Sequence, residues 1–331
     1  MPYTKEDILE RIESVIDPSL EKTLGELDAI KHVGINPETE SVMLLIEVGI
    51  KNTEITSQIT RNVAQIVKLD MGFKSLVIDY NQTRPATLTK SLKVIGIASG
   101  KGGVGKSSVT ANLAYALTSL GKKVGIIDAD VYGANMPKIF ECETKELMGT
   151  AEGKVYPFEK DGIEMVSTEF FVDTDRALMW RGPMLNKVLK IFFEDTLWSA
   201  DLEFLLIDLP PGTGDVIMDI KTFVPDAKMI LVTTPHPNAT HIAIKAGFAA
   251  KDLSQDVIGV IENMSYFEVN GKKHYIFGKN GGEMVADKLV VPFLGEVPIG
   301  QPKSGNPSIF ADSEPIGIIY LNLARKILAL L

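Results

Sequence analysis

The sequence predicts an α/β fold in which a mostly parallel sheet is flanked by helices and is preceded by a small α/β domain. From residue 93 onward, short apolar segments alternate with segments of helical period, which is typical of a parallel sheet wound with helices. Before residue 81, apolar residues recur at helical and then at alternating spacing, in the order α-β-α-β. The 331 residues are 45% apolar. A chain of this length and composition can build cores for about two domains.

The first 80 residues supply the elements of the small domain. Thr4 and Asp7 resemble a capping box at the start of a helix. Alternating apolar residues predict a strand over 41–48 with one fully apolar face. The later predicted elements are a helix over 55–67 and a strand over 75–80. Residues 81–92 are polar and have no apolar period, so we expect domains at 1–80 and 93–331 joined by a linker over 81–92.

The second domain has a regular series of apolar segments. Strands are predicted near 94–98, 123–128, 162–167, 204–209, 227–233 and 257–262, with helices between them. Residues 316–331 are apolar nearly all round, which favours packing on the sheet over a membrane-seeking helix. Asn270-Gly271 between alternating residues predicts a tight β-hairpin.

Charge and segment composition restrict the partners. There are 34 Lys and Arg against 43 Asp and Glu, a net charge of −9. This balance gives no general basic field for nucleic acid or for an anionic membrane. The N-terminus lacks the apolar core of a signal peptide, and the sequence has no run of about 18 uncharged apolar residues. We therefore expect a cytoplasmic protein without nucleic-acid binding or stable membrane association.

Residues 95–108 read IGIASGKGGVGKSS and contain the P-loop pattern Gly100-x4-Gly105-Lys106-Ser107. An apolar strand precedes the pattern and a predicted helix follows it, which is the context that a P-loop requires. This predicts a P-loop NTPase fold, with Lys106 reaching the β- and γ-phosphates and the Ser107 hydroxyl binding Mg²⁺. The predicted nucleotide-binding residues of the loop are Gly100, Lys101, Gly102, Gly103, Val104, Gly105, Lys106, Ser107 and Ser108.

Acidic residues follow two of the predicted strands. Asp128 and Asp130 come after one strand, and Asp208 follows another. Ligands of such sheets lie beyond the carboxyl ends of the strands, so both acidic groups should face the phosphate loop. Asp208 lies in a Walker B-like element and is predicted to hold Mg²⁺, usually through a water. Residues 210–214 are predicted to be a switch loop that senses the γ-phosphate.

The loop GKGGVGKS, with Lys101 directly after its first glycine, resembles the deviant Walker A loop of the ATPase group that includes MinD, ParA, the nitrogenase iron protein, ArsA and the Mrp/ApbC proteins. The resemblance implies that Lys101 reaches the partner's phosphates across a homodimer interface. It also implies that Asp130 orients or deprotonates the attacking water. Together these predict Lys101, Lys106 and Asp130 as the catalytic residues.

ATP is the expected nucleotide. The guanine-recognition motif Asn-Lys-x-Asp is missing, because Asn186-Lys187 continues with Val188-Leu189. The resemblance makes Asn263 an adenine contact and places the Pro298 region beside the base. A turn-forming role for Asn263 stays open as the alternative.

Further stretches resemble the Mrp/ApbC proteins, or iron-sulfur cluster carriers, rather than MinD or ParA. These stretches lie at 128–140, 179–198, 205–215, 261–267 and 277–289. Residues 15–20 and the order of elements make the N-terminal unit similar to a small iron-sulfur assembly domain. The resemblance implies cluster assembly or transfer to apoproteins, with assembly proteins or apoproteins as partners. Two alternatives remain: a MinD/ParA-like ATPase that recruits or positions a partner, and an assembly scaffold that handles no cluster.

The cysteine count departs from the carrier pattern. In the resembled family, the segment after ENMSYF carries a C-x-x-C pair, and two chains supply four thiolates to a [4Fe-4S] cluster. Here that segment reads SYFEVNGKKHYIFG, and the chain has one cysteine, Cys142. A dimer therefore has two cysteines where such a cluster needs four, which predicts weak or no stable [4Fe-4S] binding. Cys142 is expected to be a small buried apolar residue, and the lone His274 is not expected to bind metal.

Overall fold

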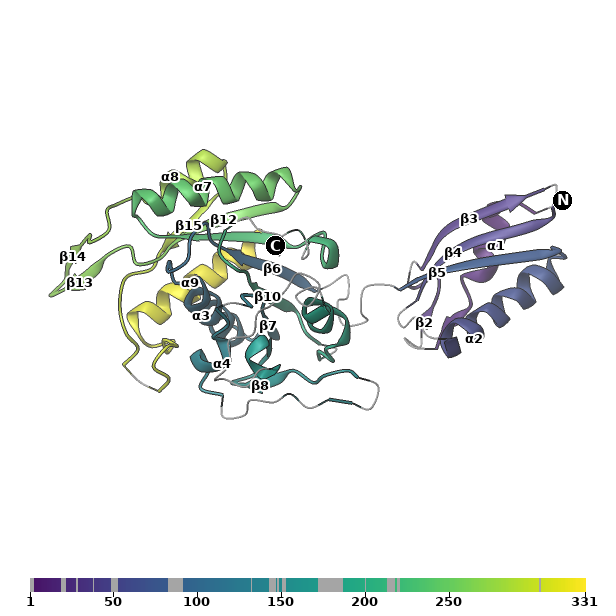
Figure 1. Ribbon diagram of the computed structural model, residues 1–331, viewed down its shortest axis with the longest axis horizontal. Coiled ribbons are helices and arrows are strands. Elements are labelled where there is room, and N and C mark those ends of the chain that lie inside the picture. Colours follow the sequence, from purple (N-terminus) through teal and green to yellow (C-terminus); the bar gives the residue numbers. More distant parts are fainter. Residues whose placement is uncertain are drawn as a thin grey trace. The chain divides into compact units, whose positions relative to one another are not determined.

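The computed structural model describes residues 3–18, 22–27, 29–37, 39–48, 53–82, 92–131, 133–142, 147, 149–150, 153–171, 187–199, 201–212, 218, 221–303 and 305–331. The chain divides into two compact units, Met1–Thr89 and Lys90–Leu331 (Figure 1). Most of the predicted linker, residues 83–91, lies outside the described residues, so the domain boundaries stay a prediction.

Unit 1 is a three-stranded sheet with its helices packed against it. Its elements are α1 (Lys5–Ile12), β1 (Ile16–Asp17), β2 (Lys22–Thr23), β3 (Ile30–Asn36), β4 (Ser41–Val48), α2 (Thr53–Ala64), the π-helical η1 (Gln65–Asp70) and β5 (Ser75–Gln82). The sheet order is β3-β4-β5, with β3 antiparallel and β5 parallel to β4. The predicted capping box is confirmed, because the Thr4 side chain and the Asp7 side chain each accept a bond from the other residue's backbone N–H. The inward residues of β4 are fully buried, as its alternation predicts: Val42, Leu44, Ile46 and Val48.

The predicted α-β-α-β order of this unit is wrong, because it omits β1, β2 and β3. Two-residue strands such as β1 and β2 are too short to show a period of two. In β3, Gly34 interrupts the alternation, and the strand is only partly buried. β5 also runs to Gln82, two residues beyond the predicted end, because Asn81 and Gln82 pair with the last two residues of β4.

Unit 2 is built on an eight-stranded sheet. Its strands are β6 (Lys93–Ala98), β7 (Val124–Asp128), β8 (Phe158–Lys160), β9 (Ile163–Ser167), β10 (Phe204–Asp208), β11 (Lys228–Thr233), β12 (Asp256–Glu262) and β15 (Phe293–Glu296), with β13 (Phe267–Val269) and β14 (Lys272–His274) in a separate hairpin. The helices whose bounds the structure describes are α3 (Lys106–Ser119), α4 (Met136–Ile139), η2 (Thr168–Phe171), η3 (Ile191–Asp195), α7 (Pro237–Asp252), α8 (Gly281–Leu289) and α9 (Pro315–Leu330). All six predicted strands are confirmed, and the short edge strands β8 and β15 were not predicted.

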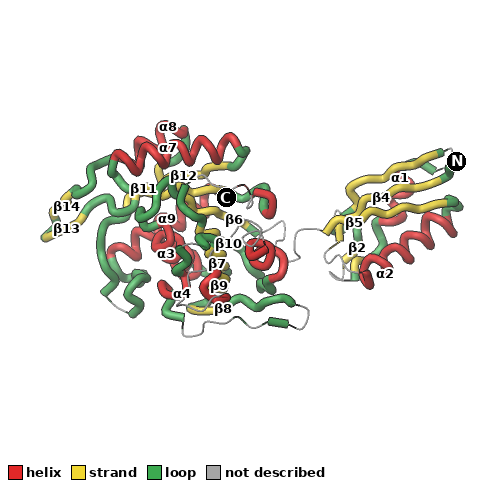
Figure 2. The backbone as a smooth tube through the Cα atoms, in the orientation of Figure 1, coloured by secondary structure: helices red, strands yellow, loops and turns green. Residues whose placement is uncertain are grey.

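The strand order is β15-β12-β11-β6-β10-β7-β9-β8, and every pair is parallel except β8 with β9. Strand β6, which leads into the glycine-rich loop, lies at the centre, with β10 and β11 as its neighbours. Helices α3 and α9 cover one face, and α7 and α8 cover the other (Figures 1 and 2). This order brings the carboxyl ends of β6, β10 and β7 to one edge of the sheet, as the parallel arrangement predicts.

The C-terminal helix α9 packs against α3 and the edge strand β15, as predicted. Its buried residues are Gly317, Tyr320, Leu323, Ala324 and Ile327. Among the described residues, no helix combines the length and the apolar character that crossing a membrane requires.

The hairpin of β13 and β14 projects from unit 2 (Figure 1). Val269 pairs with Lys272, which leaves Asn270 and Gly271 as the two turn residues. Both have positive φ angles, 50° and 74°, as the favoured two-residue hairpin turn requires. The hairpin predicted at Asn270-Gly271 is therefore confirmed.

Candidate functional site

The phosphate loop connects β6 to α3, as its sequence predicts. At Gly105 the backbone is left-handed, with φ 79°, and a β-carbon there would collide with the Asn263 amide nitrogen. At Gly100 a β-carbon would lie 2.5 Å from the backbone carbonyl carbon of Ile242. The loop can therefore keep this path only with glycine at both positions. It ends at the first turn of α3, whose backbone N–H groups favour an anion.

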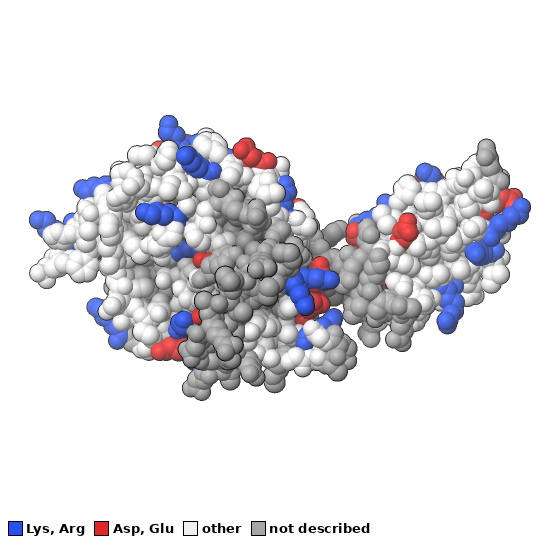
Figure 3. Space-filling view, viewed as in Figure 1, with Lys and Arg blue, Asp and Glu red and all other residues white. Residues whose placement is uncertain are grey.

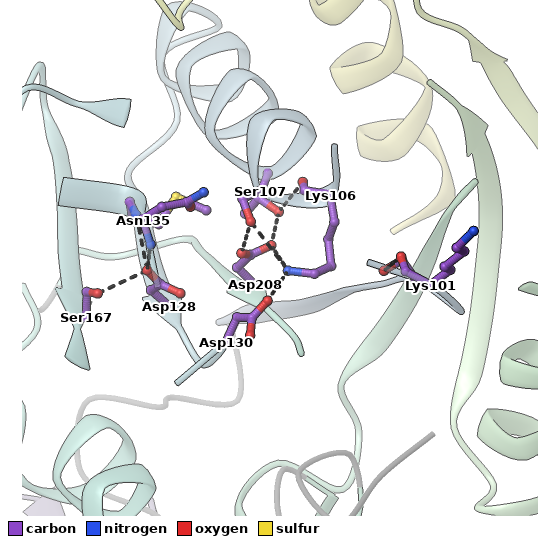
Figure 4. Close-up of polar contacts among 11 residues, drawn as sticks. Lys101, Lys106, Ser107, Asp128, Asp130, Asn135, Ser167 and Asp208 are labelled. Carbon is purple, nitrogen blue, oxygen red and sulfur yellow. Dashed lines mark hydrogen bonds and ion pairs between the residues drawn. The ribbon is translucent and has the colours of Figure 1, made fainter. Parts of the chain in front are cut away.

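A compact polar cluster lies below the loop (Figure 4). The Lys106 Nζ atom is 2.8 Å from Asp208 Oδ1, and both side chains are almost fully buried. Ser107 Oγ donates to Asp208 Oδ2 at 2.6 Å, and Thr110 Oγ1 donates to Asp208 Oδ1 at 2.8 Å. Asp208 therefore receives two hydrogen bonds and one ion pair from residues in the first turns of α3.

Asp130 lies beside this cluster. Its Oδ2 atom is 3.6 Å from Lys106 Nζ, so Lys106 lies within ion-pair distance of both Asp130 and Asp208. Burial raises the pKa of Asp130, although the Lys106 ammonium opposes that shift. The structure thus brings together the predicted residues Lys106, Ser107, Asp130 and Asp208 at one edge of the sheet.

Asp128 is fully buried behind Asp130. Its Oδ2 atom accepts bonds from the backbone N–H groups of Asn135 and Met136, at 3.0 and 3.1 Å, and from the Ser167 hydroxyl at 3.0 Å. Burial, followed by the nearby charge of Asp208, raises the pKa of Asp128 to about 7. The Oδ1 atoms of Asp128 and Asn135 are buried and have no hydrogen-bond partner within the described part of the chain.

The loop and this cluster border a cavity of about 240 Å³. Its lining consists of Ser99, residues 101–108, Asp130, Gly133, Asn135 and Pro211. The lining offers backbone N–H groups, the buried Lys106 ammonium, three serine residues and the Asp130 carboxylate. This composition suits a phosphate chain. Of the predicted switch loop, Pro211 lines the cavity and the Gly212 N–H donates to the Ser99 carbonyl at 2.8 Å, whereas residues 213 and 214 lie outside the described residues.

Lys101 has a different orientation from Lys106. Its side chain is exposed and points away from Lys106, Asp130 and Asp208 (Figure 4). It lines both the phosphate cavity and a second cavity of about 200 Å³, whose other walls include Thr234, His236 and Phe277. The structure therefore separates the two lysines of the loop: one is buried among carboxylates, and the other is free to contact something outside the chain's own carboxylate cluster.

Asn263 and Pro298 lie on neighbouring segments. Asn263 is buried, and its Nδ2 atom donates to the Val104 carbonyl of the phosphate loop at 2.9 Å. The Val297 N–H donates to the Glu262 carbonyl, which holds Pro298 close to the end of β12. Neither Asn263 nor Pro298 is among the described residues that line the phosphate cavity. Their assignment to the adenine base stays a prediction.

Three residues of the site were missed from sequence. Thr110 lies one helical turn after Lys106, and this spacing is a signal that could have identified it. Ser167 ends the predicted strand next to the one that ends at Asp128, and the two residues pair in register. Asn135, which lines the cavity, begins α4 and has no comparable signal.

Cys142 and His274 lie elsewhere. Cys142 is half-buried, with its Sγ atom 3.8 Å from Met165 Sδ, and burial raises the pKa of its thiol to about 11. His274 is exposed on β14.

Lys and Arg side chains are dispersed over the visible face of the described residues (Figure 3).

Comparison with known proteins places the chain in a family. Residues 90–325 match the ParA family in the form described as NUBPL iron-transfer P-loop NTPase. The chain is 37% identical to the iron-sulfur cluster carrier protein of Bacillus subtilis, over 98% of this chain and 97% of that protein. It is 35% identical to the iron-sulfur cluster carrier protein of Synechocystis, over 89% and 87% of the two chains.

Solved structures agree with this placement. A nucleotide-binding protein from Archaeoglobus fulgidus, in complex with ADP, is similar with a TM-score of 0.54 and 30% identity over 72% of this chain and 89% of that one. The cell division ATPase MinD of Pyrococcus furiosus, at 22% identity and a TM-score of 0.52 over 72% and 99% of the two chains, shares the fold. The chain belongs to the ParA family of P-loop NTPases, in its NUBPL iron-transfer form.

Proposed function

We propose that this chain is a Mg²⁺-dependent ATPase that works as a homodimer in the assembly of iron-sulfur clusters or in their transfer to apoproteins. The observation that carries the proposal is the cluster of Lys106, Ser107 and Asp208 below a glycine-rich loop that opens into a phosphate-sized cavity. The iron-sulfur carrier relatives, which align with nearly the whole chain, support the cellular role.

Ser107 and Asp208 are the residues that would hold Mg²⁺. Their oxygen atoms are 2.6 Å apart, and a hydroxyl with a carboxylate is the hard oxygen pair that this ion prefers. When bound, the ion would neutralise charge on the phosphate oxygens. Lys106 Nζ would turn from Asp208 to the β- and γ-phosphates, while Thr110 keeps Asp208 Oδ1 in place.

Asp130 is suited to orient the attacking water. Asp130 lines the phosphate cavity, and its Oδ2 atom is 3.6 Å from Lys106 Nζ. Its raised pKa brings the carboxylate closer to the proton affinity that a general base needs near neutral pH. Asn263 and Pro298 are the residues proposed to contact and flank the adenine base.

Lys101 is the residue proposed to act across the dimer. Its side chain is exposed and directed away from its own Asp208, so it is free to approach phosphates bound by a second copy. A cation supplied in this way stabilises transition-state charge and is worth roughly 10³ to 10⁵ in rate in other NTPases.

Holding an iron-sulfur cluster needs thiolates, and this chain lacks the C-x-x-C pair of the carrier pattern. One cysteine per chain gives two per dimer, and the raised pKa of the Cys142 thiol disfavours the thiolate that binds iron. We therefore propose that the ATPase serves cluster assembly through an assembly protein or apoprotein that brings its own thiols.

Purified protein should hydrolyse ATP slowly and only with Mg²⁺. Phosphate release is measured with MgATP, with MgGTP, and with ATP plus excess EDTA. We expect turnover with MgATP, little with MgGTP because the guanine-reading motif is missing, and none with EDTA because Ser107 and Asp208 then hold no ion. Turnover that persists in EDTA would contradict the assignment of Ser107 and Asp208.

A further inference from the structure

The backbone that carries Asp130 is closed into a loop by one buried carboxylate. β7 ends at Asp128, and the chain returns to the same place at Asn135 and Met136, where α4 begins. Asp128 Oδ2 accepts hydrogen bonds from both of those backbone N–H groups. The loop between β7 and α4 therefore begins and ends beside the Asp128 side chain.

A second contact fixes the direction of that carboxylate. Ser167 ends β9, pairs in register with Asp128, and donates its hydroxyl to the same Oδ2 atom at 3.0 Å. Both side chains are fully buried. All three donors converge on Oδ2, so the orientation of the carboxyl group is set by the loop and by β9 (Figure 4).

The other side of the loop is held by the neighbouring strand. The Ala129 N–H donates to the Asp208 carbonyl at 2.9 Å, and the Gly133 N–H donates to the Asp130 carbonyl at 2.9 Å. Asp130 therefore lies between two anchored points, one at β10 and one at Asp128. Within the described residues, Asp130 lines the phosphate cavity and Asp128 does not.

We propose that Asp128, oriented by Ser167, is a positioning residue that fixes the Asp130 loop against the phosphate cavity. Asp128 acts through the backbone N–H groups of Asn135 and Met136 and makes no contact with the substrate. The inference rests on the role proposed above for Asp130. A displacement of about 1 Å at a catalytic group costs roughly 10²-fold in rate, so loss of the loop closure should lower turnover while ATP binding persists.

The test compares Asp128→Ala, Asp128→Asn and Ser167→Ala with the wild type. Asparagine retains an oxygen that can accept the two backbone N–H groups, whereas alanine removes it. We expect Asp128→Ala to lower kcat roughly 10²-fold and Ser167→Ala roughly 10-fold, with KM and the Kd for a fluorescent ATP analogue within about 2-fold of wild type. Asp128→Asn should restore kcat to within a few-fold of wild type.

Thr196→Val serves as the matched control, because Thr196 is also a buried hydroxyl, hydrogen-bonded to the Ile191 carbonyl and outside the loop. It should leave kcat unchanged. The inference is wrong if Asp128→Ala and Ser167→Ala keep wild-type kcat, if Asp128→Asn loses as much as Asp128→Ala, or if Kd rises in parallel with the fall in kcat.

Asp130→Asn separates this inference from the proposed function. If Asp130→Asn keeps full turnover, the role of Asp130 fails and the positioning role fails with it. If Asp130→Asn loses turnover while Asp128→Ala does not, only the positioning role of Asp128 is overturned.

Discussion

Lys106→Ala is expected to abolish ATP hydrolysis and to weaken ATP binding by at least about 100-fold. Lys106 is the buried ammonium at the floor of the phosphate cavity, 2.8 Å from Asp208 and 3.6 Å from Asp130. Loss of one preorganised donor that stabilises transition-state charge costs roughly 10²–10³ in rate, and Lys106 also supplies a full positive charge. Its loss also leaves two carboxylates facing the phosphates without a counter-charge. Phosphate release and binding of a fluorescent ATP analogue measure the two effects.

Folding must be checked in this variant. Removing one partner of a buried ion pair destabilises a protein by about 3–5 kcal/mol, because the other charge is left unpaired. Lys106→Gln keeps a hydrogen-bond donor for Asp208 and should fold more stably, yet it should be as inactive as Lys106→Ala. Lys123→Ala, which removes an exposed lysine near Asp201, is the control and should be fully active. Wild-type turnover in either Lys106 variant would refute the assignment.

Lys101→Ala is expected to leave ATP binding within about 3-fold of wild type and to reduce turnover by roughly 10³-fold or more. The side chain is exposed and directed away from its own carboxylate cluster, so its loss should alter neither the fold nor the chain's own phosphate contacts. The same change should prevent ATP-dependent dimerisation, because the proposed contact lies across the dimer. Light scattering after size-exclusion chromatography, with a non-hydrolysable ATP analogue, measures the oligomeric state.

A monomer that hydrolyses ATP at the dimer's rate would contradict this role. So would a Lys101→Ala chain that dimerises and turns over normally. Lys123→Ala again serves as the control, since it removes the same charge from the edge of the sheet opposite the phosphate loop.

The sheet of unit 2 could be predicted because each central strand is buried on both faces and reads as a short apolar run. Strands β8 and β15 lie at the two edges, have four residues or fewer, and are less apolar, so they carry no such signal. In unit 1, β1 and β2 could not be predicted for the same reason, because each has only two residues. The turn at Asn270-Gly271 was predictable because both residues tolerate positive φ, which is a local property.

The phosphate loop and its two acidic strand ends could also be predicted, because residue spacing encodes them. The contact between Ser167 and Asp128 could not, since it depends on which strands are neighbours and in what register. The same holds for Asn263, whose side chain meets the Val104 carbonyl across 159 positions of sequence. Long-range contacts of this kind follow from strand order, which the sequence pattern leaves open.

The proposed function combines a carrier-type ATPase site with a chain that lacks a complete set of cluster ligands. Anaerobic reconstitution with ferrous iron and sulfide, with and without MgATP, measures how much iron and sulfide the protein retains after desalting. We expect far fewer than four irons per dimer and no difference between wild type and Cys142→Ala, because two cysteines cannot replace four thiolates. Four irons and four sulfides retained per dimer would show that the chain itself holds a cluster and would contradict this function.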